Sequence, residues 1–276
     1  MCPCLTANPL LVHGCDDIPD LIKHRLQRGE RLILFAVGRM FHHNIIQYLG
    51  MQGDFDGFWI DLEHGGLTVH DIELAAMAGR AHGLDCFVRI PPTDYATVTR
   101  CFESGASGIM AAQIGSAAQA EEIVRWSKFA PRGHRGMNPL GYDGGYGSIP
   151  MAEFAERHNR DSFVAVMIET ASAVEEADDI AAIDGVDLLF VGPSDLSQAM
   201  GVIGDINHEK CIAAIDRVAA ACRNQGKHWG AVTPTPAYAS MLVEKGCTLL
   251  TPTNDVKLVA AGAAAVRSQY ADLWQR

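Results

Sequence analysis

The stretch FDGFWIDLEHGG, residues 55–66, passes directly from apolar to ionisable side chains. Asp61, Glu63 and His64 lie within four positions of one another and are followed by two glycines. Histidine changes its charge near neutral pH and can therefore act as an acid or a base. A single histidine is more often structural, but two neighbouring acids and two glycines favour chemistry. We interpret His64 as a candidate acid–base group and Asp61 as the residue that orients its ring.

Two carboxylates follow later apolar segments in the same way. Glu169 comes directly after FVAVMI, and Asp195 follows VDLLFVGPS. Either carboxylate alone could cap the helix that begins beside it, and Glu169 could instead form an ion pair. Together, at the ends of adjacent strands, they could each give one oxygen to a hard divalent ion such as Mg²⁺ or Mn²⁺. A bound cation would also remove the repulsion between them.

Arginine residues follow two further apolar segments. Arg89 lies in CFVRIPP and Arg39 in AVGRM. The planar guanidinium of Arg89 suits an anionic oxygen of a substrate, and the alternative is a structural ion pair with Asp61 or Glu63. Arg39 could meet an acidic tail of a substrate or lie on the surface, and the sequence favours neither.

Eight short, continuously apolar segments alternate with helical patterns along the chain. The expected strands are residues 31–38, 55–61, 84–90, 106–114, 163–169, 186–192, 228–233 and 247–252. Continuous hydrophobicity is typical of parallel strands that are covered on both faces. Eight such units in 276 residues predict a (β/α)₈ TIM barrel, whose active site lies at the carboxyl ends of the strands. A doubly wound open sheet is the main alternative, but no G-x-G-x-x-G turn follows the first strand.

Helical periodicity is clearest in four segments, residues 68–83, 117–130, 208–226 and 255–276. In the first, Thr68 and Asp71 form a variant of the capping box, and Gly83 is the expected left-handed end. The glycine-rich residues 131–162 interrupt the alternation, and such long connections are usually functional. His134 and Arg135 in this connection are therefore retained as candidates, whereas His158 is expected on a helix surface.

Composition restricts the class of protein. The net charge of −11 and pI near 5.4 disfavour nucleic acid as a partner. No apolar run reaches the roughly 18 residues that span a membrane, and no signal peptide is indicated. We expect a cytoplasmic protein with a single barrel domain over residues 1–276, in which residues 1–19 form an N-terminal extension.

The eight cysteines are too scattered for a disulfide scaffold, so we expect reduced and mostly buried thiols. The pair Cys2 and Cys4 in MCPC has no partner residues at the spacing of a zinc site. Lys128, Lys227 and Lys245 lie on helices or after them rather than at strand ends. This placement argues against an imine mechanism through a lysine.

Five motifs together resemble one known family. WIDLEHGG, FVRIP, APRGHRGMN, VMIETASAVE and GVDLLFVGPSDLSQAMG occur in the order and spacing of the HpcH/HpaI aldolases. The resemblance extends from about residue 20 to the end of the chain. It is closest to the class II, metal-dependent 2-keto-acid aldolases, which have barrels of the phosphoenolpyruvate/pyruvate type.

The resemblance implies a role for each strand-end residue. Glu169 and Asp195 are similar to the metal-binding carboxylates, with Mg²⁺ or Mn²⁺ as the expected ion and Co²⁺ or Zn²⁺ as alternatives. His64 is similar to the catalytic histidine, with Asp61 as its partner, and Arg89 to the arginine that holds the keto oxygen.

The resemblance also implies that the backbone amides of Ser194 and Asp195, at a helix N-terminus, bind the substrate carboxylate. One position departs from the family pattern, because Met167 stands where relatives usually carry glutamine. A thioether is only a weak acceptor and donates no hydrogen bond. Met167 therefore puts the choice of substrate in doubt.

The implied reaction cleaves or forms a 4-hydroxy-2-keto acid, giving pyruvate or a close analogue plus an aldehyde through a metal-stabilised enolate. Family members assemble as trimers of dimers and exchange the C-terminal helix between subunits, and residues 255–276 suit that arrangement. One alternative is a CoA-ester lyase of the citryl or malyl type, although no basic patch for CoA phosphates is evident. The other is a catalytically inactive barrel with a binding role.

Overall fold

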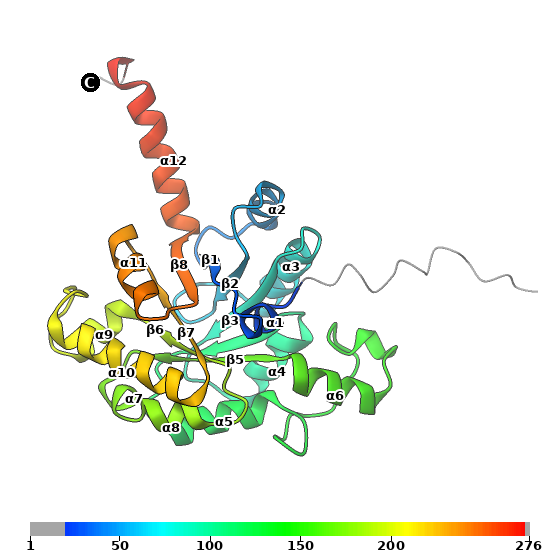
Figure 1. Ribbon diagram of the computed structural model, residues 1–276. Coiled ribbons are helices and arrows are strands. Elements are labelled where there is room, and N and C mark those ends of the chain that lie inside the picture. The colour runs from blue at the N-terminus through cyan, green and yellow to red at the C-terminus, as the bar shows by residue number, and fades with distance from the viewer. Residues whose placement is uncertain (1–19, 274–276) are drawn as a thin grey trace, which may run out of the picture.

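The computed structural model describes residues 20–273, and these residues form a closed barrel of eight parallel strands (Figure 1). Each strand pairs with the next along the chain, and the last pairs with the first. The predicted (β/α)₈ architecture is confirmed, and the open-sheet alternative is wrong. The strands are β1 (Leu32–Val37), β2 (Gly57–Asp61), β3 (Asp85–Ile90), β4 (Gly108–Ala111), β5 (Phe163–Ile168), β6 (Leu188–Val191), β7 (His228–Val232) and β8 (Leu249–Asn254).

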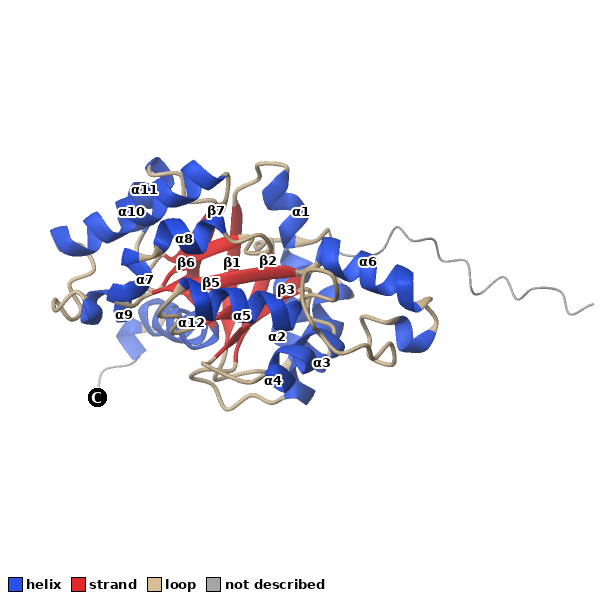
Figure 2. Ribbon diagram, turned by 90° about the horizontal axis from the view of Figure 1, so that it is seen from below, coloured by secondary structure: helices blue, strands red, loops and turns tan. Residues whose placement is uncertain are grey.

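Helices surround the barrel, as the view in Figure 2 shows. They are α1 (Ile22–Gln27), α2 (His43–Gln52), α3 (Val69–Arg80), α4 (Tyr95–Glu103), α5 (Ala117–Ser127), α6 (Met151–Asp161), α7 (Ala171–Glu175), α8 (Ala177–Ala182), α9 (Pro193–Ala199), α10 (Glu209–Gln225), α11 (Pro236–Glu244) and α12 (Asp255–Gln269). Short 3₁₀ turns occupy Gly145–Gly147 and Ala271–Leu273.

Alternate residues of each strand enter two separate hydrophobic clusters. Phe87 and Ala165 belong to a smaller cluster, whereas their neighbours Val88 and Val166 belong to a larger one that also includes helix residues. Successive side chains of a strand point to opposite faces. The smaller cluster therefore fills the barrel and the larger one joins strands to helices, which explains why the strands are apolar throughout. Met167 lies in the inner cluster.

The capping box predicted at the start of α3 is present. The Asp71 carboxylate accepts hydrogen bonds from the backbone N–H and the hydroxyl of Thr68, both at 2.7 Å. The helix ends at Arg80, earlier than predicted, and a turn leads to Gly83, which has the expected left-handed conformation with φ of 72°.

The glycine-rich residues 131–162 lie at the end of the barrel opposite the expected active site. They connect the end of α5 to the start of β5, so they belong with the amino ends of the strands. Arg135 is buried, pairs with Asp143 at 2.6 Å and contacts the His158 ring. His158 is only 8% exposed, so its expected surface position is wrong. Arg135 and His158 therefore stabilise the connection. His134, in contrast, is exposed.

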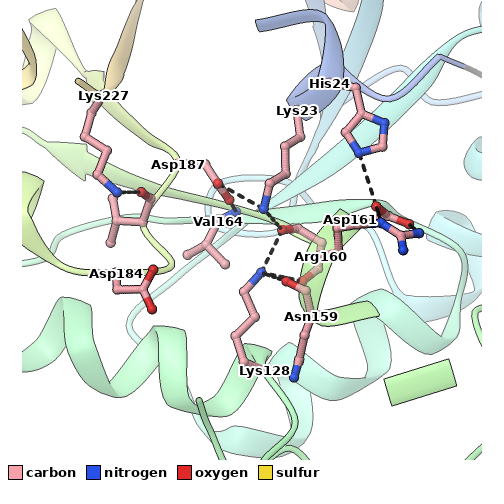
Figure 3. Close-up of polar contacts among 12 residues, drawn as sticks. Lys23, His24, Lys128, Asn159, Arg160, Asp161, Val164, Asp184, Asp187 and Lys227 are labelled. Atoms are coloured by element: carbon pink, nitrogen blue, oxygen red, sulfur yellow. Dashed lines mark hydrogen bonds and ion pairs between the residues drawn. The ribbon is translucent and has the colours of Figure 1, made fainter. Parts of the chain in front are cut away.

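A buried lysine cluster closes the same amino end of the barrel (Figure 3). Lys128 Nζ donates to the carbonyl and hydroxyl oxygens of Ser162, at 2.9 and 2.7 Å. Lys23 donates to the same carbonyl and pairs with Asp187 at 3.1 Å. Lys128 is 2% exposed, and its burial, with the charge of Lys23 as a smaller cause, lowers its pKa to about 7.

The structure also bears on the predictions for the cysteines and for membrane-spanning helices. The five cysteines within residues 20–273 are all buried and free. Cys2, Cys4, Cys15 and the predicted extension over residues 1–19 lie outside the described residues. In the described part of the chain, no helix combines the length and hydropathy needed to cross a membrane. Helix α12 projects away from the barrel with most of its side chains exposed (Figure 1).

The buried lysine predicts a pH dependence of stability. Between about pH 7 and the ordinary lysine value of 10.5, the unfolded chain holds a proton that folded Lys128 has lost. Stability therefore rises with pH across this window. We expect the melting temperature of the protein, minus that of Lys128→Met, to increase between pH 7 and pH 9. Lys210→Met, at an exposed site on α10, controls for the loss of one charge, and a flat difference curve for Lys128→Met would contradict the assignment.

Candidate active site

The strand-end residues predicted from the sequence meet on one rim of the barrel. Asp61 ends β2 and pairs in register with Arg89 near the end of β3. Glu169 follows β5 directly, and Asp195 is the third residue of α9, just after β6. Because the strands are all parallel, their carboxyl ends face the same side.

Arg89 forms ion pairs with both Asp61 and Glu63, which was the structural alternative for this residue. Its Nε and Nη2 atoms donate to the two oxygens of Asp61 at 3.0 and 2.6 Å, and Nη1 lies 3.2 Å from Glu63 Oε2. Burial raises the pKa of Asp61, but the hydrogen bonds and charge of Arg89 outweigh it, so the net pKa is lowered. Burial raises the pKa of Glu63. The guanidinium also lies over the Trp59 ring, 5.0 Å from its centroid.

The predicted contact between Asp61 and the His64 ring is wrong. Asp61 Oδ1 accepts the backbone N–H groups of Glu63 and His64 at 3.0 and 3.2 Å, and both of its oxygens also bind Arg89. Asp61 therefore holds the turn rather than the imidazole. The ring lies nearest to Glu63, with 3.6 Å between His64 Nε2 and Glu63 Oε2. The glycine that follows makes room for backbone, since a Cβ at Gly65 would lie 2.4 Å from the Asp61 carbonyl oxygen.

Glu169 is a buried carboxylate of the rim with hydrogen bonds to only one of its two oxygens. Its Oε1 accepts two hydrogen bonds from Gln113, from the backbone N–H at 2.8 Å and from Nε2 at 3.1 Å. Its Oε2 is buried and has no hydrogen-bond partner among the described residues. Burial raises the pKa of Glu169 to about 7, and the charges of Glu63 and Asp195 add to that rise.

Two backbone features maintain this arrangement. Gln113 has a φ of 52°, a left-handed conformation that non-glycine residues rarely adopt. A Cβ added to Gly192 would lie 2.3 Å from Glu169 Oε2 and 3.0 Å from Met167 Cε. A larger residue at position 192 would therefore fill the space in front of the unpartnered oxygen. The strained backbone conformation of Gln113 is of a type that often occurs at functional sites.

The donor set around Glu169 fits a divalent cation with few protein ligands. An unpartnered buried oxygen on Glu169 and the nearby charge of Asp195 offer two hard oxygen ligands. Within residues 20–273, no group of three or more histidine, cysteine, aspartate or glutamate side chains could hold a metal. Mg²⁺ is commonly bound by one or two carboxylates, with water or substrate oxygens completing the octahedron. The residues present therefore fit such a site better than a site built entirely from protein ligands.

A cavity of about 300 Å³ lies at the same rim of the barrel. It is lined by the ends of β1, β2, β3, β7 and β8, and it includes Arg39, Asp61, His64, Arg89 and Lys257. A cavity of about 490 Å³ lies at the amino end of the barrel near Asp85 and Ser162, and one of about 570 Å³ lies between α3, α4 and residues 138–146. Only the first of these three contains strand-end residues of the rim.

The structure adds residues that the sequence analysis did not single out. Gln113 carries no sequence signal, because its role depends on its left-handed backbone. Lys257 lies three residues beyond β8 and lines the cavity. The buried Asp255 accepts three consecutive backbone N–H groups, which no spacing rule predicts. Ser194 lies in the first turn of α9, as expected, so its amide has no helical partner.

Comparisons with known proteins show similarity in sequence and in fold to one family. The family description HpcH/HpaI aldolase/citrate lyase matches residues 31–261. The chain is 38% identical over 194 residues to 4-hydroxy-4-methyl-2-oxoglutarate aldolase tasA of Hapsidospora irregularis, covering 70% of this chain and 72% of that protein. It is 29% identical over 210 residues to 5-keto-4-deoxy-D-glucarate aldolase of Klebsiella pneumoniae subsp. pneumoniae, covering 76% and 81%. The crystal structure of an HpcH/HpaI aldolase from Desulfitobacterium hafniense DCB-2 has a TM-score of 0.84 and 30% identity, covering 91% and 96%.

The hydrogen bonds of Gln113 predict how the site responds to its replacement. Gln113→Gly retains the backbone donor and relieves the strained φ, but it removes the side-chain donor to Glu169. Loss of a residue that orients a metal ligand usually weakens metal binding about 10- to 100-fold. We therefore expect at least a tenfold rise in the Mn²⁺ dissociation constant, measured by calorimetry.

Tyr146→Gly is the matched control for that measurement. Tyr146 is the other non-glycine residue with a positive φ, 53°, within the described chain, and it lies exposed in the connection before β5. It should leave Mn²⁺ affinity unchanged. Equal Mn²⁺ affinity in both variants and the parent protein would show that Gln113 does not position Glu169.

Proposed function

The chain belongs to the HpcH/HpaI aldolase/citrate lyase family, and on this premise we propose that it is a divalent-metal-dependent aldolase. Its substrates would be 4-hydroxy-2-keto acids, cleaved to or formed from pyruvate, or a close analogue, and an aldehyde. As such an aldolase, it would be an aldehyde-lyase. The observation that carries the proposal is the unpartnered oxygen of buried Glu169, on the same rim as Asp195 and Arg89.

Glu169 and Asp195 would hold the cation, with Mg²⁺ or Mn²⁺ as the proposed ion. When bound, the cation would supply Lewis-acid polarisation of the carboxylate and keto oxygens of the substrate. The amides of Ser194 and Asp195 in the first turn of α9 would bind the substrate carboxylate. Met167 is buried beside Gly192. Its side chain has no amide group that could donate a hydrogen bond to a substrate, so it would influence which keto acid is accepted.

Arg89 can serve both the ion pairs and the substrate. A guanidinium has five N–H donors. The hydrogen bonds to Asp61 use two of them, and Nη1 also forms an ion pair with Glu63. The remaining donors would stabilise the negative charge that develops on the keto oxygen as the C3–C4 bond breaks. The two acids hold the guanidinium in place for this task, so the structural and functional interpretations of Arg89 are compatible.

His64 would act as the acid–base group for the C4 hydroxyl. Its side chain is 58% exposed and lines the cavity beside Arg89. In the cleavage direction, His64 would accept the hydroxyl proton directly or through water, and C4 would leave as the aldehyde carbonyl. The electron pair of the broken bond moves toward the C2 oxygen, and a proton added at C3 then gives the 2-keto acid.

The comparisons support the CoA-ester lyase alternative only weakly. A citrate lyase of Burkholderia xenovorans LB400 is 18% identical with a TM-score of 0.60, which shows a shared fold alone. A catalytically inactive barrel would not explain why Glu169, Arg89 and His64 lie on one rim.

The exposed helix α12 supports a proposal about assembly. Val259, Val266 and Tyr270 are each about half exposed on or directly after a helix that projects from the barrel (Figure 1). We propose that α12 packs against other copies of the chain in a trimer of dimers, in the cytoplasm. Light scattering in solution gives the mass of that assembly, and a monomer would rule it out.

Metal removal tests the proposed reaction. Exhaustive chelation should abolish release of pyruvate from 4-hydroxy-2-oxopentanoate, and Mn²⁺ or Mg²⁺ should restore it. Glu169→Gln preserves the shape of the side chain but removes the ligand charge, so added metal should not restore that variant to within about a hundredfold of the parent kcat/KM. Full turnover after chelation would exclude the mechanism.

A further inference from the structure

Trp59 lies inside the barrel, one layer further from the rim than the ion pair of Arg89 and Asp61. It precedes Asp61 by two residues on β2 and pairs in register with Phe87, which precedes Arg89 by two residues on β3. Residues two positions apart on a strand point to the same face, and Trp59 and Phe87 both belong to the inner hydrophobic cluster. Arg89 and Asp61 therefore form the next layer of the barrel interior, directly above Trp59.

The Arg89 guanidinium lies over the Trp59 ring. Its Cζ atom is 5.0 Å from the ring centroid, and the two residues are only 9% and 4% exposed. The acids contact N–H groups of the same guanidinium, Asp61 at 3.0 and 2.6 Å and Glu63 at 3.2 Å. The guanidinium therefore has two kinds of support, which are ion pairs with its N–H groups and the face of an indole beneath it.

A hydrogen bond across the barrel interior fixes the orientation of the Trp59 ring. Its Nε1 atom donates to the hydroxyl of buried Thr251 at 3.1 Å. Thr251 belongs to β8, and β1 separates β8 from β2 in the closed barrel. The Trp59 ring also meets the Phe190 ring at 72°, with 6.5 Å between the centroids. Rotation of the indole would leave a buried donor unpaired, which is unfavourable, so the ring is held in place beneath Arg89.

A fixed aromatic ring has two effects on the charge above it. The face of an indole attracts a cation, and this attraction is stronger where water is excluded. The ring also takes the place of water beside the guanidinium, since both side chains are buried. Trp59 and Arg89 line the same 300 Å³ cavity at the rim. A charge that is held in place before the reaction stabilises developing negative charge more effectively than one that must reorient.

We propose that Trp59 is a positioning residue for the reaction and that it acts through Arg89. Its ring holds the guanidinium so that the N–H groups not used by Asp61 face the oxygen on which negative charge develops. This inference rests on the proposed function for the role of Arg89. A tryptophan with a purely structural role would stabilise the barrel without changing how well the site distinguishes a negatively charged oxygen from a neutral keto oxygen.

Two ligands that differ at this oxygen test the inference without turnover. Pyruvate has a neutral keto oxygen, whereas oxalate has a second carboxylate in that position and resembles the enolate. Calorimetry with Mn²⁺ gives the ratio of the two dissociation constants. Trp59→Leu should reduce the preference for oxalate about tenfold, because it removes a cation–π contact from which water is excluded. Trp59→Phe retains a ring and should keep most of the preference.

Phe163→Leu is the matched control for these measurements. Phe163 is a fully buried aromatic residue of the same inner cluster, but it begins β5 and therefore lies near the amino end of the barrel. Its replacement should lower the melting temperature, as Trp59→Leu should, and leave the preference for oxalate unchanged. An unchanged preference in Trp59→Leu, or an equal loss in Phe163→Leu, would overturn the positioning role.

A double variant and turnover complete the test. In an Arg89→Met background, Trp59→Leu should have no further effect on the preference for oxalate, and a full tenfold effect there would contradict action through Arg89. The single variants decide the question if Arg89→Met does not fold. With 4-hydroxy-2-oxopentanoate, Trp59→Leu should lower kcat about tenfold with Mn²⁺ affinity unchanged. If the protein cleaves no 4-hydroxy-2-keto acid but its preference for oxalate still depends on Trp59, the positioning role stands and the aldolase proposal fails.

Discussion

The buried carboxylate of Glu169 is the constraint on which the rest of the rim depends. Gln113 satisfies one oxygen with two hydrogen bonds, and the other oxygen has no partner in the described chain. Leaving a buried polar atom unpaired costs about 1–3 kcal/mol, and the left-handed backbone of Gln113 adds to that cost. Gly192 keeps the space in front of the free oxygen open. A divalent cation placed there explains these features together.

Arg89 connects this carboxylate to the other half of the rim. Asp61 and Glu63 fix its guanidinium, so its charge is available toward Glu169 and toward the cavity without side-chain movement. Groups that are held in place before the reaction stabilise developing charge more effectively than groups that must reorient. His64 is less constrained than Arg89, which suits a residue that accepts and returns a proton. The rim thus combines a rigid electrostatic part with a more exposed acid–base group.

Sequence patterns predicted the barrel and most of the rim because both follow from order along the chain. Continuous apolar segments identified all eight strands, and parallel strands bring their last residues to one side. Those patterns did not predict which side chains contact one another at the rim. Asp61 serves the backbone and Arg89 rather than the His64 ring, and Gln113 depends on a φ angle that its residue type does not suggest. The buried position of His158 likewise depends on a connection that packs against the amino end of the barrel.

A crystal structure of the protein with Mn²⁺ and oxalate would test the central claim most directly. Oxalate stands in for the carboxylate and keto oxygens of a 2-keto acid. The account predicts one anomalous peak bound by Glu169 Oε2 and an oxygen of Asp195, at about the 2.0–2.2 Å distance typical of such ions, with oxalate on its open side toward Arg89. A peak elsewhere, or no peak with the two carboxylates turned away from each other, would contradict it.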